Sequence, residues 1–450
     1  MQAQPASRPV RRLEWGALAA VLLGFVLWFS GPEHMPRVNH LVQDTVSWLY
    51  PRRASPDIVI VSIDARSIQA IGRWPWRRAL HAELIHRISA QAPRAIGMDI
   101  LFGEEDLDYP GDDLLLAQAM HSSGRVVLPV IRREATPGGR PGTERPFTPF
   151  VQAAAELGHV HVHMDSDGVM RSIYRQEGPA SAPWPHLSLA MACVAGAAQP
   201  ACQQDTAVPR RGAWVRKDPQ IIAFANGSAP FTSYSYIDVL RGQVPAAAFR
   251  DKYVLVGATA PGLGDLLPAP VGLQVRHMPN VELVAHILSN ELTHVRIQPA
   301  SGLANSAFNL LPVGLALWAL AALGPSAALM GCIALAIAML AFAGLAPGIW
   351  EVMLSPAAGL AGIAMAYPLW SWRRLSAATR FLELEMQTLR REGLPISPAG
   401  DGPHRGDFLE RRIRAVEHAS EHLRNIKLIA IPGILSMAAR RGVLLRLFLG

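Results

Sequence analysis

Two aspartates stand at the ends of strand-like segments in the first quarter of the chain. Asp64 follows the β-branched run Asp57–Ile63, and Asp99 lies within the run Arg94–Phe102. Ligands of open α/β sheets bind outside the carboxyl ends of parallel strands, so we expect both side chains to face one crevice. Paired carboxylates could bind a cation or act as general acid and base. Each could equally be a local cap or hydrogen-bond acceptor, because buried carboxylates are usually satisfied nearby.

The loop after the first run adds charge and aromatic surface beside the same edge. Arg66, Arg73 and Trp74 are therefore candidate ligand-binding residues, together with the two aspartates. The segment Trp74-Pro75-Trp76 could instead form an apolar plug over the sheet, since tryptophan buries a large area wherever it can. The sequence leaves both interpretations open.

Three histidines at alternate positions would share one face of a strand: His159, His161 and His163. Imidazoles with this spacing can hold a metal ion, which makes them weak candidates for a metal site. One strand alone rarely completes a coordination shell, and no second group of ligands is identifiable in the sequence. A half-exposed histidine face is the simpler interpretation, so we predict no metal and no cofactor.

Two further patterns have structural interpretations. Gly257–Asp265 has the glycines of a phosphate-binding loop but lacks the Lys-Ser/Thr that follows them in nucleotide-binding proteins. Its glycines are predicted to let the backbone turn sharply after a core strand. Cys193 and Cys202 could form a disulfide bond if they lie outside the cytoplasm. Cys332 falls within an apolar run and is interpreted as a packing residue.

The elements that must position these residues alternate between strand and helix. They are predicted in the order Asp57–Ile63, Arg78–Gln91, Arg94–Phe102, Asp112–Met120 and Arg125–Ile131, which begins and ends with a strand. Two successive crossovers of this kind imply an α/β core, with a mainly parallel sheet and helices on its faces. Asp112 is expected to cap the second helix.

The second half of this region is predicted to return to the same sheet. His159–His163 and Val169–Arg175 are interpreted as a hairpin that turns at Gly168. Lys252–Gly257 has the composition of another buried strand, and Val281–Leu292 that of a helix. The sheet is therefore expected to receive strands from both ends of the region.

Apolar runs near both ends of the chain approach the roughly 20 residues that a bilayer-spanning helix needs. The first, Trp15–Ser30, follows several arginines and is interpreted as a retained signal anchor. Three more follow with little charge: Ala307–Leu323, Ser326–Leu345 and Ile349–Trp372. Because Arg373-Arg374 comes directly after the last run, both termini are expected inside and residues 31–305 outside.

The sequence thus predicts six regions, which are a cytoplasmic N-terminus (1–12), a transmembrane anchor (13–31), an extracytoplasmic domain (32–305), three transmembrane helices (306–372), a helical, coiled-coil-like cytoplasmic linker (373–427) and an apolar, basic tail (428–450). The tail could be the product of a truncation or a frameshift. The net charge of +7 lies largely in the flanks and the tail, which suits topology and anionic lipid rather than nucleic acid.

Five segments carry a family resemblance: DIVIVSIDARSIQAIGRWPWRRALHAELI, PRAIGMDILF, LGHVHVHMDSDGVMR, KYVLVGATAPGLGD and MPNVELVAHIL. They resemble the CHASE domain of type 2, the cyclase/histidine-kinase-associated sensory extracellular domain, over Arg37–Ile297. The Gly72–Trp76 and Val256–Thr259 blocks are the most specific. The resemblance implies an input module, followed by three membrane spans and an output unit, but it supplies no binding residues. The chain departs from the family pattern at His286, which stands two positions later than the family's histidine.

Two classes of function follow. The first is a sensory input module of bacterial signal transduction in the inner membrane, with a large periplasmic domain and no catalytic output of its own. The second is an enzyme, either the N-terminal fragment of a sensor histidine kinase or cyclase receptor, or an enzyme in the outer domain. Expected partners are an unidentified extracytoplasmic ligand, the lipid bilayer, a second copy of the chain through membrane and linker helices, and a separate cytoplasmic output protein.

Overall fold

The computed structural model describes residues 8–31, 34–50, 52–133, 142–197, 214–227, 229–264, 266–271 and 274–391. These residues form two compact units. The sheet unit comprises Pro32–Gly302 and Phe342–Ser355, and the helical unit comprises the described parts of Met1–Gly31, Leu303–Ala341 and Pro356–Gly450. The predicted tail, 428–450, lies outside the described residues, as does the linker beyond Arg391.

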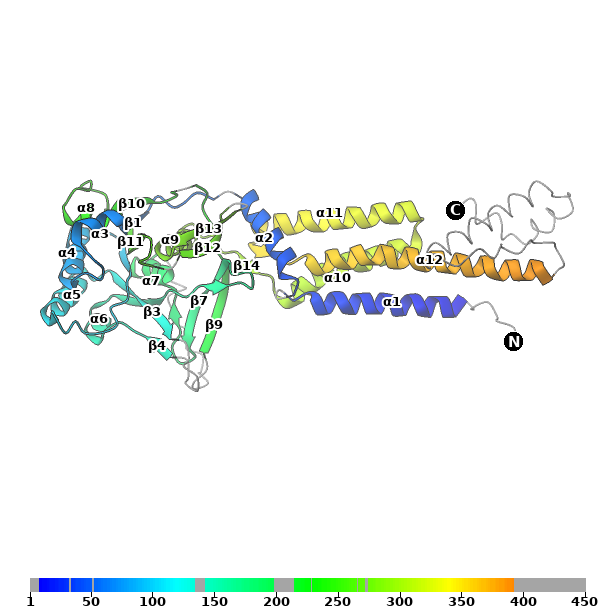
Figure 1. Cartoon of the computed structure of the whole chain (residues 1–450), viewed down its shortest axis with the longest axis horizontal. Helices are drawn as coiled ribbons and strands as arrows, with labels where there is room; N and C mark the ends of the chain where they lie inside the picture. Colours follow the sequence, from blue (N-terminus) through cyan, green and yellow to red (C-terminus); the bar gives the residue numbers. More distant parts are fainter. Residues whose placement is uncertain are drawn as a thin grey trace, which may run out of the picture. The chain divides into compact units, whose positions relative to one another are not determined.

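The sheet unit is built on a mainly parallel sheet, as predicted (Figure 1). Its strands are β1 (Ile58–Ile63), β2 (Ala95–Asp99), β3 (Val126–Arg133), β4 (Gly142–Glu144), β5 (Glu156–His159), β10 (Thr232–Ser235) and β11 (Tyr253–Ala258). They lie in the order β10-β1-β11-β2-β3-β4, and β5 also pairs with β3. Only the β3–β4 pairing is antiparallel among these described strands. The sheet therefore receives its central strand, β11, from late in the sequence.

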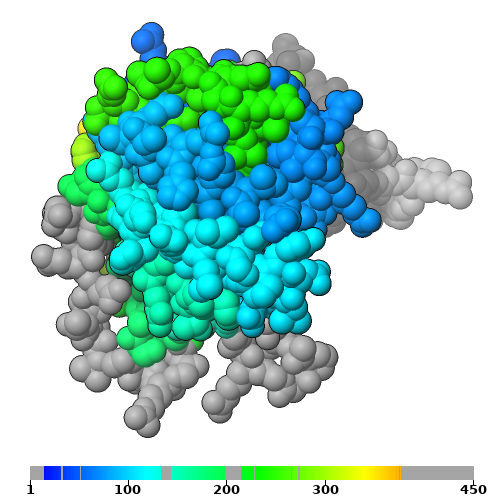
Figure 2. Space-filling model, turned by 90° about the vertical axis from the view of Figure 1, so that its left-hand side faces the viewer, coloured from blue at the N-terminus to red at the C-terminus, as the bar shows by residue number. Residues whose placement is uncertain are grey.

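Helices cover both faces of this sheet. One face packs against α3 (Ala65–Ile71), α4 (Arg78–Ser89), α5 (Pro110–Ser123), α6 (Thr148–Ala153) and α8 (Tyr236–Leu240), and the other against α7 (Leu187–Val194) and α9 (Asn280–Leu292). Successive residues of a strand point to opposite faces, so Val59 and Val61 enter the first core whereas Ile58 and Ile60 enter the second. Figure 2 shows the first helical layer from outside, where blue and cyan segments form much of the surface and green segments lie along the top.

A second, antiparallel sheet lies beside the first. It consists of β6 (His163–Met164), β7 (Met170–Pro179), β8 (Trp184–Pro185) and β9 (Trp214–Ile221). The β6–β7 hairpin turns at Gly168, whose φ of 77° is the left-handed conformation that glycine favours, as predicted. The predicted strand His159–His163 is wrong, however. His159 ends β5 in the parallel sheet, and His163 begins β6 in the antiparallel one.

Two shorter features complete the sheet unit. The hairpin of β12 (Leu266–Val271) and β13 (Gln274–Pro279) leads into α9, and α2 (Pro36–Leu49) precedes β1. In addition, β14 (Gln298–Pro299) pairs in parallel with β15 (Val352–Met353). The backbone N–H of Gln298 donates to the Glu351 carbonyl at 2.8 Å. The segment that follows α11 is therefore a strand of the sheet unit.

The helical unit is built from α1 (Arg8–Phe29), α10 (Gly302–Ala322), α11 (Pro325–Ile349) and α12 (Ala357–Arg391), and the end of α11 from Phe342 onwards belongs to the sheet unit. Glycines let α12 approach its neighbours: a Cβ added to Gly362 would lie 2.6 Å from Val26 of α1 and 2.8 Å from Val313 of α10. By length and composition, α10 and α11 could each cross a membrane, and Trp15–Phe29 forms a shorter apolar helix.

Three predicted boundaries are wrong. The predicted break at Ala346-Pro347-Gly348 comes a few residues too early, because α11 continues through Pro347 and ends at Ile349. The run Ile349–Trp372 is not one helix, since its first residues pair with β14 and α12 begins at Ala357. Asp112 does not cap α5, which begins at Pro110; its carboxylate instead accepts from Arg77 Nε at 2.9 Å.

Candidate functional site

Asp64 is the N-cap of α3. Its Oδ1 accepts hydrogen bonds from the backbone N–H of Ser67 at 2.8 Å, from the Ser67 hydroxyl at 2.6 Å and from the Ser235 hydroxyl at 2.9 Å. These bonds join the start of α3 to the start of α8, whose N-cap is Ser235. The carboxylate thus satisfies the first turn of a helix.

Asp99 lies on the other side of the sheet's central strand. At the end of β2, its two oxygens accept from Asn280 Nδ2, at the start of α9, at 2.9 and 3.1 Å. Burial raises the pKa of Asp99 to about 6, although the Asn280 hydrogen bonds oppose the shift. Because β11 separates β1 from β2, the structure gives Asp64 and Asp99 separate partners and does not bring them together.

Replacing Asp64 with alanine is expected to destabilise the sheet unit by about 1–2 kcal/mol, the usual effect of losing an N-cap. The buried Ser67 hydroxyl would lose its carboxylate acceptor as well. Asp64→Asn, which keeps an acceptor at the cap, is the matched control and should lose less. Thermal unfolding followed by tryptophan fluorescence measures both, and equal stability of wild type and Asp64→Ala would refute the capping role.

Replacing Asp99 with asparagine is expected to change how stability depends on pH. The folded-state pKa of about 6 lies above the ordinary value of 3.8, so the stability that protonation gives is present below pH 4. It is lost as the pH rises through 6. At pH 7.5 Asp99→Asn should therefore be more stable than wild type by about 1–3 kcal/mol, and the advantage should vanish at pH 4. Unfolding at the two pH values measures this; a pH-independent difference contradicts it.

The remaining candidates at this edge do not form a common site. Arg66 is exposed and pairs with Asp238 of α8 at 2.7 Å, and Arg73, which follows the end of α3, is also exposed. The two tryptophans instead pack into the core. Trp74 lies edge-to-face against Trp76, with ring centroids 5.3 Å apart, and Trp76 Nε1 donates to the Gly72 carbonyl at 2.8 Å. The two rings therefore form an apolar plug over the sheet.

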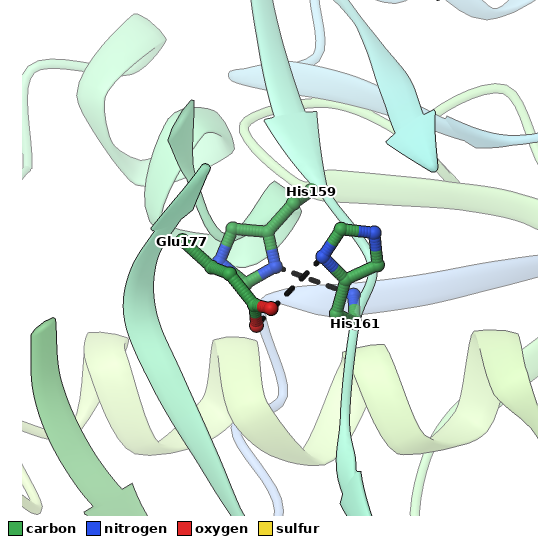
Figure 3. Close-up of side chains that lie close together, drawn as sticks. All are labelled: His159, His161 and Glu177. Atoms are coloured by element: carbon green, nitrogen blue, oxygen red, sulfur yellow. Dashed lines mark hydrogen bonds and ion pairs between the residues drawn. The ribbon is translucent and has the colours of Figure 1, made fainter. Parts of the chain in front are cut away.

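A polar cluster lies where the two sheets meet. His159 ends β5, His161 follows it, and Glu177 comes from β7 (Figure 3). One ligand-type atom of each lies within 4.8 Å of the others, and the two imidazole rings stack with centroids 5.2 Å apart. His186, the N-cap of α7, packs edge-to-face on His159 at 5.1 Å. His163 lies in the other sheet and is not part of this group.

The hydrogen bonds of the ring nitrogens decide what this cluster can bind. A backbone N–H can donate only to an unprotonated ring nitrogen. His159 Nδ1 accepts from the His161 backbone at 3.2 Å, and His161 Nε2 accepts from the Arg132 backbone. His186 Nδ1 likewise accepts from Ser188 N at 3.3 Å. In the neutral rings the protons are therefore on His159 Nε2, His161 Nδ1 and His186 Nε2.

This proton placement does not fit a metal centre. A ligating imidazole offers a lone pair to the metal and donates its other N–H to an acceptor. In this cluster the two nitrogens of His161 have the opposite roles. The nitrogen that faces Glu177, Nδ1, carries the proton, 3.7 Å from Oε2, and the other nitrogen, Nε2, accepts a hydrogen bond instead of donating one. Glu177 also accepts from Trp214 Nε1 at 2.8 Å and from Arg216 Nε at 3.1 Å. The cluster is a group of neutral histidines beside one carboxylate, and within the described residues His159 Nε2, His161 Nδ1 and His186 Nε2 make no hydrogen bond.

Burial keeps these histidines neutral. It lowers the pKa of His186 to about 3, with His161 and Arg175 nearby as further causes, and it lowers the pKa of His159 well below the usual value. Sequence reasoning found His159 and His161 by their spacing but missed Glu177 and His186. Glu177 and His186 lie 16 or more residues further along the chain than His161. They reach the two histidines only through the pairing of strands that are distant in sequence.

The most extensively bonded buried charge in the described residues is Arg171 of β7. Its Nε and Nη2 donate to Asp44 of α2 at 2.8 and 3.0 Å. Its Nη1 donates to Asp165 at 2.9 Å and to Asp167 at 3.0 Å. His40, also on α2, lies 3.0 Å from Asp167. This network fastens α2 to the β6–β7 hairpin.

The cysteine prediction is only partly within the described residues. Cys193, near the end of α7, is disulfide-bonded, and Cys332 is free and buried in α11. Cys202 lies outside the described residues, so its pairing with Cys193 stays a prediction.

The family model described as the CHASE2 domain matches residues 18–324, which is more than half of the chain. The match covers the sheet unit up to β14, together with α10 and most of α1. No curated protein and no solved structure matches the chain.

Proposed function

Because the chain belongs to the CHASE2 domain family, a sensory domain family of signalling proteins, we propose that it is a membrane-anchored signal-input protein. In this proposal the sheet unit lies in the periplasm of a bacterial cell. The anchor 13–31 and three spans within 306–372 hold it in the inner membrane. The two apolar helices α10 and α11 support this assignment.

One observation carries the proposal beyond the family. β15, the segment between α11 and α12, is hydrogen-bonded into the sheet unit through β14. The Ala300 N–H donates to the Met353 carbonyl at 2.9 Å, only four residues before α12 begins. A shift of the sheet unit on ligand binding would therefore act directly on the start of α12. α12 extends for 35 residues and would pass the signal towards the cytoplasm.

The proposal also covers how the signal leaves the sheet unit. We propose that the sheet unit has no catalytic activity of its own, and that α12 and the linker pass the signal to a kinase, a cyclase or another output protein. A pair of chains joined through α12 would suit this role, because Leu375, Leu382 and Leu389 recur every seven residues. An enzyme in the sheet unit is the alternative.

Reporter fusions test the proposed topology. Alkaline phosphatase or green fluorescent protein fused after Gly139, within the sheet unit's sequence, should report the periplasm. The same reporters fused after Gly402 should report the cytoplasm. A fusion after Gly324, in the turn between α10 and α11, serves as an internal control for the side expected between two spans. Equal phosphatase activity at Gly139 and Gly402 would refute the topology.

A further inference from the structure

One side of α2 packs against the sheet unit through both polar and apolar residues. Asn39 and Val46 are buried, and Asp44 is bonded to Arg171 of the β6–β7 hairpin. The opposite side exposes large apolar residues, with these exposed fractions: Val38 43%, Leu41 66%, Trp48 49% and Leu49 57%. A helix on the surface of a soluble domain carries mostly polar and charged residues on its outer side. An exposed apolar surface of this kind indicates contact with an apolar partner or a membrane.

The position of α2 in the chain indicates what those surroundings are. The apolar helix α1 ends at Phe29, and α2 begins at Pro36. The six residues between them span at most about 20 Å when extended, so the chain keeps the start of α2 within that distance of the end of α1. A helix so placed lies near the membrane surface if α1 is the anchor.

The other end of α2 meets the end of a second apolar helix. Tyr50, its C-cap, packs against Gly348 in the last turn of α11; a Cβ added there would lie 2.9 Å from the tyrosine ring. In the same unit Ile349 and Trp350 are exposed. Tryptophan and tyrosine concentrate at membrane–water interfaces, where a ring can be half in lipid and half in water. Trp48, Tyr50 and Trp350 are suited to that place.

We propose that α2 is an interfacial helix, with Val38, Leu41, Trp48 and Leu49 inserted between the lipids of the outer leaflet. The inference rests on the proposed function, because it needs the sheet unit to be held at a membrane. Helices of this kind lie in the interface plane, with the apolar face buried about 5–10 Å into the headgroup and acyl boundary. The Asp44–Arg171 pair then couples the bilayer surface to the β6–β7 hairpin.

Site-directed spin labelling of the full chain tests the proposal. Leu41→Cys and Trp48→Cys variants, in a Cys332→Ala background, would be labelled with a nitroxide in nanodiscs of phosphatidylcholine and phosphatidylglycerol. The Cys332→Ala chain without an added cysteine, labelled in parallel, gives any signal from Cys193 and Cys202. Oxygen, which concentrates in lipid, and a water-soluble nickel chelate then compete as relaxing agents. Leu114→Cys, an exposed leucine on α5, is the matched control in water. Ile337→Cys, an exposed residue of α11, is the control for lipid.

At positions 41 and 48 we expect oxygen access close to that at 337, with loss of the nickel access found at 114. Nickel access equal to that at 114 would overturn the proposal, and so would spin–spin broadening at 41 and 48, which indicates contact with a second copy. If position 337 itself were open to nickel, the membrane assignment of α11 would fail first. The two failures can therefore be told apart.

Discussion

Replacing Arg171 with methionine should destabilise the sheet unit by about 3–5 kcal/mol, the range observed when one partner of a buried ion pair is removed. Arg171 is only 3% exposed, and its loss would leave Asp44, Asp165 and Asp167 close together without the guanidinium that they share. Methionine keeps much of the side-chain volume, so the effect reports the charge and the hydrogen bonds. Chemical unfolding of the detergent-solubilised chain, followed by tryptophan fluorescence, measures it.

The matched control is Arg66→Met. Arg66 makes a similar bidentate pair with Asp238 but its side chain is 61% exposed, so its loss should cost less than about 1 kcal/mol. A pH series adds a second check. Burial alone would raise the pKa of Asp167, but hydrogen bonds from Arg171 and the Val169 backbone lower it to about 2. The ionised Asp167 carboxylate therefore stabilises the folded wild-type protein above pH 4, and this stabilisation is lost as the pH falls towards 2. Equal stability losses in Arg171→Met and Arg66→Met would contradict the account.

Replacing Gly158 with alanine should cost about 3 kcal/mol, at the upper end for overpacking a well-packed core. A Cβ at this position would lie 2.6 Å from Leu187 Cα and 2.9 Å from Leu187 N. These are backbone atoms, so no side-chain rotation relieves the contact. The close approach of β5 to the start of α7 is also what brings His159 onto His186.

Gly264→Ala is the control for this prediction. A Cβ there would meet only the Ala258 Cβ, at 3.5 Å, which is an ordinary contact. Gly264→Ala should therefore change the unfolding midpoint only slightly. If Gly158→Ala unfolds at the same denaturant concentration as Gly264→Ala, the close approach of β5 and α7 is refuted.

The sequence predicted the parallel sheet because each early strand is a short β-branched run followed by an amphipathic helix. The hairpin at Gly168 also followed from local turn chemistry. The glycines of Gly257–Asp265 were predicted to allow a sharp backbone turn, and this is confirmed at Gly262, whose φ is 83°. The prediction is wrong for Gly257, which lies within β11, where an added Cβ would be 2.7 Å from Val281 of α9.

The site could not be predicted in the same way, because it depends on strand order. Asp64 and Asp99 each follow an early strand, and local patterns place those strands side by side. The late strand β11 enters between them and separates the two carboxylates. Likewise, the spacing of His159 and His161 was visible, whereas Glu177 and His186 join them only through the pairing of β5, β7 and α7. Long-range pairing is the information that a local pattern lacks.

The central claim, that the sheet unit controls α12, can be tested in a chimera. Residues 1–391 would be joined in frame to the cytoplasmic part of a histidine kinase, and autophosphorylation would be measured in membranes. Ala300→Pro removes the N–H that bonds to Met353, whereas Ala300→Val keeps it. Because one hydrogen bond contributes about 1 kcal/mol, we expect Ala300→Pro to change kinase activity about fivefold at equal expression, with Ala300→Val close to wild type. Identical activity in all three chimeras would contradict the account.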